Sequence, residues 1–240
     1  MNKEKIKRYG ILSVLFFLPV AFLLMLLPAK HHYTPLDIIK FGVKNLIRFS
    51  SEGEKVLLED HISVIGFLGN DPIDMSVTAS NVKELVYDKF KGFKKFQIIM
   101  ILPNGTKAQA EKLKAEISGY EELKYWHFVY GSPTAIESFY NSLKTEKQLN
   151  SNLASEDIFI VDKDLNQRGR LDDREKKKYA DTTLVIELTS YNTIKVSELK
   201  NKFGDDLRVL FQEYREKRKG TFESSDARRA NDLKPEHEQN

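Results

Sequence analysis

Three side chains stand at the spacing of a calcium-binding loop. Asp162, Asp164 and Asn166 fall at positions 1, 3 and 5 of such a loop, and Asp173 falls at position 12. An EF-hand loop needs glycine at position 6 and a bidentate glutamate at position 12. The chain has Gln167 at position 6 and lacks that glutamate. The pattern therefore predicts a polar turn between two strands rather than a calcium site.

Histidines are the next candidate metal ligands. His31 and His32 follow an apolar N-terminal segment, and His61 opens a predicted strand. Adjacent histidines need further ligands from elsewhere in the chain to complete a tetrahedral site. We therefore expect them to act as polar residues near a membrane interface, and we expect His127, beside Trp126, to be a half-buried strand residue.

A short acidic loop also offers oxygen and sulfur ligands. Asp71, Asp74 and Met75 lie within residues 70–76 and could form a weak metal site. Acidic pairs in loops more often fix turns and cap helices. The sequence favours this second role, with Asp74 or Ser76 capping the helix that follows.

The chain contains no cysteine. Disulfides, thiol nucleophiles, thiolate metal sites and dithiol redox exchange are therefore excluded. A glycine-rich phosphate loop, a Ser-His-Asp set and paired buried carboxylates are also missing from the pattern. We expect no catalytic activity and no cofactor.

The charge balance argues against a nucleic-acid partner. The 240-residue chain has 38 Lys and Arg residues against 35 Asp and Glu, a net charge of +3. The first eight residues alone carry +3, so the remainder is close to neutral. Nucleic-acid binding needs a basic face on the folded domain. Hydrophobic residues make up 41% of the chain, enough for one packed domain plus extensions.

The N-terminus reads as a membrane anchor. A basic segment, residues 1–10, precedes an apolar segment, residues 11–28, whose charge-free run is long enough to span a bilayer. The basic cluster predicts a cytoplasmic N-terminus. A cleaved signal peptide is the alternative, although residues 27–29 match an Ala-x-Ala site poorly. A buried core helix is a third possibility, for which the segment shows no amphipathic face.

Apolar strands alternate with amphipathic helices in the rest of the chain. This alternation predicts an α/β fold with a central sheet. Strands are expected at 61–68, 96–102, 126–129, 157–162 and 169–171, and helices at 81–93, after Thr106, at 134–143 and at 196–219. We assign residues 29–50 to a stalk or entry segment, 51–219 to the folded domain and 220–240 to a disordered polar tail.

Three stretches carry a resemblance to a known family. They are Val64–Gly69 (VIGFLG), Phe128–Ser138 (FVYGSPTAIES) and Ile158–Arg170 (IFIVDKDLNQRGR). Together they resemble the Sco/SenC family of membrane-anchored, thioredoxin-fold copper proteins of respiratory membranes. The resemblance covers residues 50–218. It implies a thioredoxin-like central sheet flanked by helices and preceded by one N-terminal transmembrane helix.

The copper ligands of the family are missing. The family binds copper through a Cys-x-x-x-Cys loop, which falls at residues 70–76 here, and through a histidine, whose place is taken by residues 154–156. The resemblance therefore implies no copper site. We predict that this face instead binds a protein partner. The candidate residues are Asn70, Asp71, Asp74, Met75, Ser76, Ser155 and Glu156.

The resemblance implies a function as a non-catalytic binding or assembly factor in the bacterial envelope, linked to respiratory oxidase assembly. The chain would cross the bacterial inner membrane once and place its soluble domain in the periplasm. A metal carrier or enzyme with ligands such as His31, His32, His61 or Met75 is the alternative. A purely structural envelope protein is a third.

Overall fold

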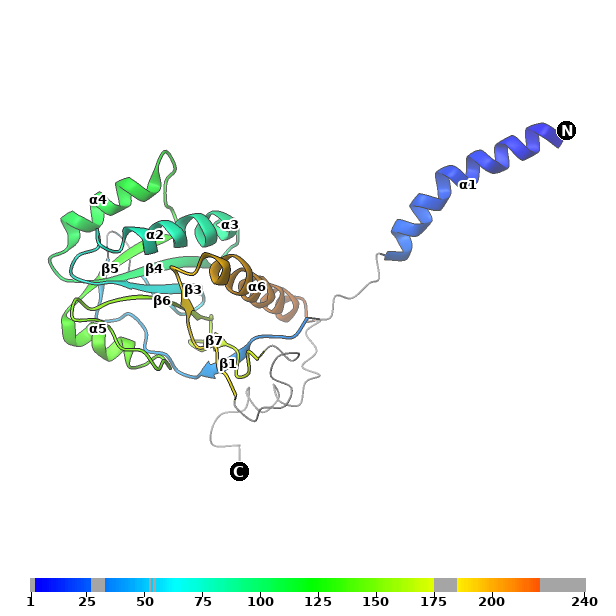
Figure 1. Cartoon of the computed structure of the whole chain (residues 1–240). Helices are drawn as coiled ribbons and strands as arrows, with labels where there is room; N and C mark the ends of the chain where they lie inside the picture. Colours follow the sequence, from blue (N-terminus) through cyan, green and yellow to red (C-terminus); the bar gives the residue numbers. More distant parts are fainter. Residues whose placement is uncertain (1–2, 27–32, 52, 54, 175–184, 221–240) are drawn as a thin grey trace, which may run out of the picture. The chain divides into compact units, whose positions relative to one another are not determined.

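The computed structural model describes residues 3–26, 33–51, 53, 55–174 and 185–220 (Figure 1). The chain divides into two compact units, Met1–Thr34 and Pro35–Asn240. Apart from Gly220, the predicted tail at 220–240 lies outside the described residues, and so do His31 and His32.

The first unit holds one helix, α1 (Lys3–Leu26). Its stretch Lys7–Met25 is long and apolar enough to cross a bilayer, and no other helix among the described residues is. None of this stretch is buried. The predicted apolar segment is therefore a helix of spanning length, as a membrane anchor requires, and a signal sequence meets the same criteria.

The second unit is built on one mixed sheet. Its strands are β1 (Asp37–Lys40), β2 (Ser50–Ser51), β3 (Ile62–Leu68), β4 (Phe96–Pro103), β5 (Trp126–Gly131), β6 (Ala154–Val161), β7 (Gln167–Gly169) and β8 (Tyr191–Asn192). The strand order is β1-β7-β6-β3-β4-β5-β2, and β8 pairs with β6. β3, β4 and β5 are parallel, whereas β6 runs antiparallel to both β3 and β7.

Helical segments connect and close this sheet. They are α2 (Ser76–Val82), the π-helical turn η1 (Lys83–Tyr87), α3 (Asp88–Phe90), α4 (Lys107–Ser118), α5 (Pro133–Tyr140), the π-helical turn η2 (Glu198–Phe203) and α6 (Gly204–Lys219). Parallel strands joined by helical crossovers lead into an antiparallel pair and then into a closing helix. This is the thioredoxin arrangement, and the predicted fold class is confirmed.

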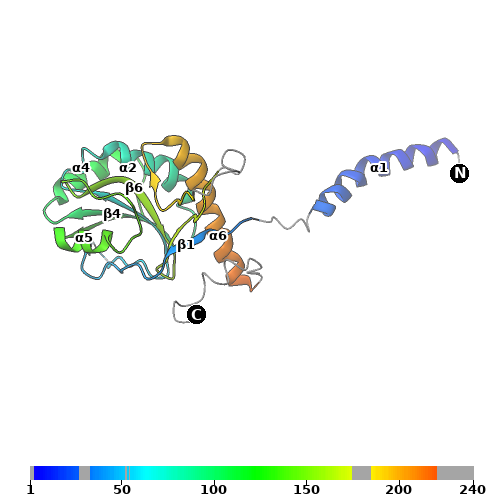
Figure 2. The ribbon, with the colours of Figure 1, turned by 60° about the horizontal axis from the view of Figure 1, so that its bottom comes forward.

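Strand alternation gives the sheet two apolar faces. On β3, Val64 packs into a core shared with Val82 of α2 and Leu207 of α6. Its neighbour Ile65 points to the other face and joins a core with Phe139 of α5. Figure 2 shows α2 and α4 on one side of the sheet and α5 on the other. Because both faces are covered, β3 and β4 are buried along their whole length.

The folded unit begins earlier than the predicted boundary at residue 51. β1 pairs with β7, which places Asp37 opposite Gly169, and β2 pairs with β5. Val43 and Leu46 belong to the core that contains α5. Residues 35–50 are therefore part of the domain, not a stalk. Because these strands are short and their partners lie far away in sequence, local periodicity does not reveal them.

Two boundaries on the candidate face also differ from the prediction. The helix expected from residue 81 begins at Ser76. The strand expected from Asp157 begins at Ala154, because Ala154 and Ser155 pair with Leu68 and Phe67 of β3. The register between the two strands shifts next to this extension, where Ile65 pairs with Phe159 and Phe67 pairs with Ser155. Pairing with β3 thus extends β6 through polar residues that have no strand pattern of their own.

The helices α5 and α4 begin in different ways. Ser132 caps α5, and its hydroxyl oxygen accepts a hydrogen bond from the amide of Ala135 at 3.2 Å. Thr106 stands at the N-cap position of α4 but does not cap it with its side chain. Its buried hydroxyl donates instead to the carbonyl of Pro103 at 2.9 Å.

Candidate functional site

The predicted partner-binding loop leaves β3 through a turn that requires glycine. Gly69 has φ +70, and an added Cβ would overlap the carbonyl oxygen of Asn152 and lie 2.8 Å from the Cβ of Ala154. The next amide, that of Asn70, donates to the Asn152 carbonyl at 2.8 Å. The start of the loop therefore lies directly against the chain entering β6. Because Leu68 pairs with Ala154, the two segments that the sequence analysis assigned to one face begin at the same end of the sheet.

Inside the loop, one of the two acidic side chains fixes a turn. The Asp71 carboxylate accepts a hydrogen bond from the amide of Ile73 at 3.3 Å. Asp74 is exposed. The N-cap position of α2 is occupied by Met75, which makes no side-chain cap hydrogen bond. The expectation that Asp74 or Ser76 caps α2 is therefore wrong, because Asp74 precedes the cap position and Ser76 already lies inside the helix.

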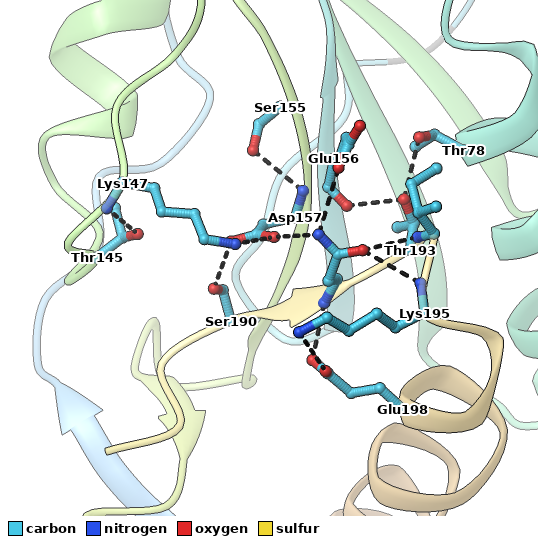
Figure 3. Close-up of polar contacts among 12 residues, drawn as sticks. Thr78, Thr145, Lys147, Ser155, Glu156, Asp157, Ser190, Thr193, Lys195 and Glu198 are labelled. Carbon is cyan, nitrogen blue, oxygen red and sulfur yellow. Dashed lines mark hydrogen bonds and ion pairs between the residues drawn. The ribbon is translucent and has the colours of Figure 1, made fainter. Parts of the chain in front are cut away.

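The start of β6 is held by hydrogen bonds from the segment around β8. The Glu156 carbonyl accepts from the amide of Thr193 at 2.8 Å and from its hydroxyl at 2.7 Å. The Glu156 carboxylate accepts from the side-chain amide of Asn192 at 3.4 Å. The Ser155 hydroxyl oxygen accepts from the amide of Asp157 at 3.1 Å. These polar groups are visible in Figure 3, where each is engaged in local structure.

Thr193 also connects this strand to the helix after the loop. Its hydroxyl lies 3.0 Å from that of Thr78 in α2, and its carbonyl accepts from the side chain of Asn81 at 2.9 Å. A hydroxyl has one proton, and Thr193 gives its proton to Glu156. Thr78 must therefore donate to Thr193. Helix α2 and strand β6 are thus joined through one buried threonine.

A buried aspartate forms a second polar centre, which the sequence analysis missed. The Asp157 side chain is 2% exposed, and its carboxylate accepts from the Lys147 ammonium and from the Ser190 hydroxyl, both at 2.8 Å (Figure 3). Beside it, the Tyr140 hydroxyl donates to the Lys147 carbonyl, and burial raises the Tyr140 pKa. The sequence signal for this centre was a charged residue, Asp157, at the start of a predicted apolar strand.

Exposed apolar residues stand next to the bonded threonines in the sequence. Val77 precedes Thr78 and Ile194 follows Thr193, and the two threonine hydroxyls lie 3.0 Å apart. We call the exposed apolar set the docking patch. It consists of Ile73 (37% exposed), Val77 (57%), Ile194 (44%) and Val196 (47%).

The geometry does not favour metal binding. Among the described residues, no group of three or more His, Cys, Asp or Glu side chains could hold an ion. His61 lies before β3, away from the loop that follows it, and its Nδ1 is 3.0 Å from the Glu59 carbonyl. His127 is in β5, where burial first, and then the charges of His61 and Lys114, lower its pKa.

The calcium-like spacing marks a polar turn, as predicted. One Asp162 oxygen accepts from the amides of Asp164 at 3.0 Å and Asn166 at 2.9 Å. The other accepts from the buried guanidinium of Arg168 at 2.9 Å. Both carboxylate oxygens are therefore used within the fold.

Comparison with known proteins shows similarity at the level of the fold only. No protein-family model matches the chain, and no curated protein does. Among solved structures, ScoI from Bradyrhizobium japonicum with copper bound is 14% identical, with a TM-score of 0.38 over 71% of this chain and 99% of that one. The soluble domain of Sco1 from Bacillus subtilis is 14% identical, with a TM-score of 0.43 over 71% and 91%.

Yeast Sco1 with copper bound is 10% identical, with a TM-score of 0.40 over 70% of this chain and 88% of that one. The chain is thus structurally similar to Sco proteins of thioredoxin fold and has no cysteine. Because it has no cysteine, the chain cannot carry out copper–thiolate or dithiol chemistry.

Proposed function

We propose that this protein is a non-catalytic binding or assembly factor of the bacterial envelope, anchored by α1, which binds a membrane protein through the docking patch. The observation that carries the proposal is the exposed apolar set Ile73, Val77, Ile194 and Val196 around a satisfied polar contact. Large apolar side chains exposed together on a folded domain are typical of interaction sites.

The polar groups under the patch support binding rather than catalysis. Thr78 and Thr193 are buried and bonded to one another, and the Asp157 carboxylate is held by Lys147 and Ser190. A nucleophile needs a base within reach and an unspent proton. These hydroxyls and this carboxylate are used to fix the surface in place.

The setting of the protein follows from α1 and from the family resemblance. A helix of spanning length with a basic N-terminus would place the folded unit outside the cytoplasm. The resemblance to Sco/SenC proteins supports a partner in respiratory oxidase assembly, and this fold-level analogy is the basis of that part of the proposal.

Site-specific crosslinking in cells tests the proposal. A photoreactive amino acid at exposed Val77 samples the docking patch, and one at exposed Ala108, in the first turn of α4, serves as the matched control. We expect the Val77 probe, and not the Ala108 probe, to enrich respiratory oxidase subunits or a cysteine-bearing Sco relative, identified by mass spectrometry.

A charge substitution separates binding from folding. Val77→Asp combined with Ile194→Asp alters only exposed positions, so the fold should persist while the apolar patch is lost. A probe at Ile73 should then lose its specific crosslinks. Identical crosslinks from the patch and from Ala108, or crosslinks that survive both substitutions, would contradict the proposal.

A further inference from the structure

A groove at another part of the folded unit is lined by basic and aromatic residues. It encloses about 730 Å³ between the C-terminal half of α6, the turn between α3 and β4, and the turn between β6 and β7. Its lining is Ile62, Gly92, Phe93, Lys94, Lys163, Asp164, Arg208, Phe211, Gln212, Tyr214, Arg215, Lys217 and Arg218. Six of these residues are cationic and one is acidic.

Three of the cations have no carboxylate partner in the part of the chain that the structure describes: Lys94, Arg215 and Arg218 are exposed, and none of them forms an ion pair there. Arg208, by contrast, pairs with Asp205 at 2.7 Å. Since the chain after residue 8 is nearly neutral, such a concentration of positive charge is a local feature. It attracts anions.

Aromatic side chains line the groove together with these cationic residues. Phe93 stacks on Phe211 with ring centres 4.1 Å apart and remains 44% exposed. The Tyr214 ring lies 5.4 Å from the Lys163 ammonium, and its hydroxyl donates to Asp164 at 2.8 Å. Exposed rings beside Lys and Arg are the composition of surfaces that rest in the headgroup region of a bilayer.

The groove also lies beside the point where the folded unit begins. The Arg168 guanidinium donates to the Leu36 carbonyl at 2.8 Å and to Glu213 of α6 at 2.6 Å. Glu213 precedes Tyr214 in the groove wall. Figures 1 and 2 both show the chain entering β1 beside α6. Residues 26–35 span at most about 35 Å, which limits how far Leu36 can lie from a membrane that α1 crosses.

We propose that this groove binds the phosphate headgroups of anionic phospholipids and so holds the folded unit against the bilayer. The inference rests on the membrane anchoring given under the proposed function. The unpaired cations supply the charge complementary to phosphate, and the rings supply the apolar contact. We choose a bilayer as the occupant because residues 26–35 limit the distance between Leu36 and the membrane that α1 crosses.

The cysteine-free chain allows a direct test on the full-length protein. Gly92 lines the groove, and an added Cβ there meets nothing within 4 Å, so Gly92→Cys can carry an environment-sensitive fluorophore. Ala108→Cys, in the first turn of α4, is the matched probe outside the groove. Each labelled protein is reconstituted into neutral vesicles and into vesicles containing phosphatidylglycerol.

We expect a shift to a less polar environment at Gly92 that depends on phosphatidylglycerol, falls with salt and is missing at Ala108. Replacing Lys94, Arg215 and Arg218 with Gln should raise the anionic lipid needed for half the signal by about tenfold or more. Replacing three exposed lysines outside the groove, Lys55, Lys112 and Lys200, should change it little.

The remaining outcomes overturn one idea or both. If the protein floats with vesicles but Gly92 behaves like Ala108 in both lipids, anchoring stands and the groove inference fails. If inorganic phosphate produces the same shift in neutral vesicles, the ligand is free phosphate and the lipid assignment is wrong. If the full chain does not float with vesicles at all, the anchoring proposal fails together with the inference.

Discussion

The Arg168 guanidinium donates to the Glu213 carboxylate at 2.6 Å where the two side chains are 1% and 0% exposed. The same guanidinium binds Asp162 at 2.9 Å and the Leu36 carbonyl at 2.8 Å. One buried cation therefore ties β7 to the end of β6, to α6 and to the start of the folded unit. Such a centre stabilises only while all its charges remain paired.

Replacing Arg168 should therefore destabilise the fold severely. Arg168→Met removes the guanidinium from two buried carboxylates: Asp162 loses its cationic partner, and Glu213 keeps only Lys217 at 2.9 Å. We expect a cost of about 3–5 kcal/mol in the free energy of unfolding. Urea unfolding of the full-length protein in detergent, followed by the fluorescence of buried Trp126, measures the loss.

Two further variants test the physical reason for that loss. Adding Asp162→Asn to Arg168→Met removes the buried charge that has lost its cationic partner and keeps an oxygen for the amides of Asp164 and Asn166, so the double variant should be more stable than the single one. Arg208→Met breaks a pair whose side chains are 59% and 66% exposed, and it should cost about 1 kcal/mol or less. Equal losses in Arg168→Met and Arg208→Met would contradict the explanation that buried carboxylates without their guanidinium cause the loss.

The turn at Gly69 should tolerate no side chain. Gly69→Ala combines positive φ with an overlap against Asn152, so we expect a loss above the 1–3 kcal/mol typical of backbone strain alone. Gly105→Ala is the control, because Gly105 has φ +94 but open space around its Cβ position. Denaturant unfolding should rank Gly69→Ala well below Gly105→Ala, and equal stability of the two would exclude a role for the contact with Asn152.

Acidification should weaken the protein through His127. Burial lowers the folded pKa of this side chain below 6.5, so the unfolded chain binds its proton more tightly. The stability linked to neutral His127 is therefore fully present above pH 6.5. It is lost as the pH falls from 6.5 through the pKa of His127 in the folded protein. His127→Gln should flatten this part of the pH dependence, measured as the difference between the two unfolding curves.

A ring titration provides the second check on His127. Its imidazole resonances in NMR spectra should shift at a lower pH than those of an unstructured histidine. A titration midpoint at or above 6.5 would contradict the expected direction.

The long buried strands could be predicted from the sequence because their apolar runs carry their own signal. β3 and β4 match the expected 61–68 and 96–102 closely. β1, β2 and β8 could not, because each has two to four residues and forms only by pairing with a distant strand. The polar residues at the start of β6 were missed for the same reason.

The candidate face could also be predicted only in part. The predicted segment 70–76 begins against Asn152 and Ala154, which precede the predicted segment 155–156. Thr193, which joins Glu156 to the helix α2 that follows the loop, is one threonine after a two-residue strand and has no motif around it. Its importance depends on contacts with Thr78 and Glu156, which are far away in sequence. Whether this face binds a partner stays a prediction.

The Thr78–Thr193 pair gives the last prediction. Thr193→Val keeps the shape of the side chain but leaves the buried Thr78 hydroxyl without its acceptor, at a cost of about 1–3 kcal/mol. Adding Thr78→Val removes that unsatisfied group. The second substitution should therefore cost less in the Thr193→Val background than alone, and a double-mutant cycle from urea unfolding measures this coupling.

The same cycle connects stability to the docking patch. If the pair holds α2 against β6, Thr193→Val should also weaken crosslinking from Val77, which precedes Thr78. Asn70→Ala, which keeps the backbone hydrogen bond to Asn152 and alters only an exposed side chain, should leave those crosslinks unchanged. Additive free energies in the cycle, with full crosslinking from Val77, would show that the threonine contact does not position the patch.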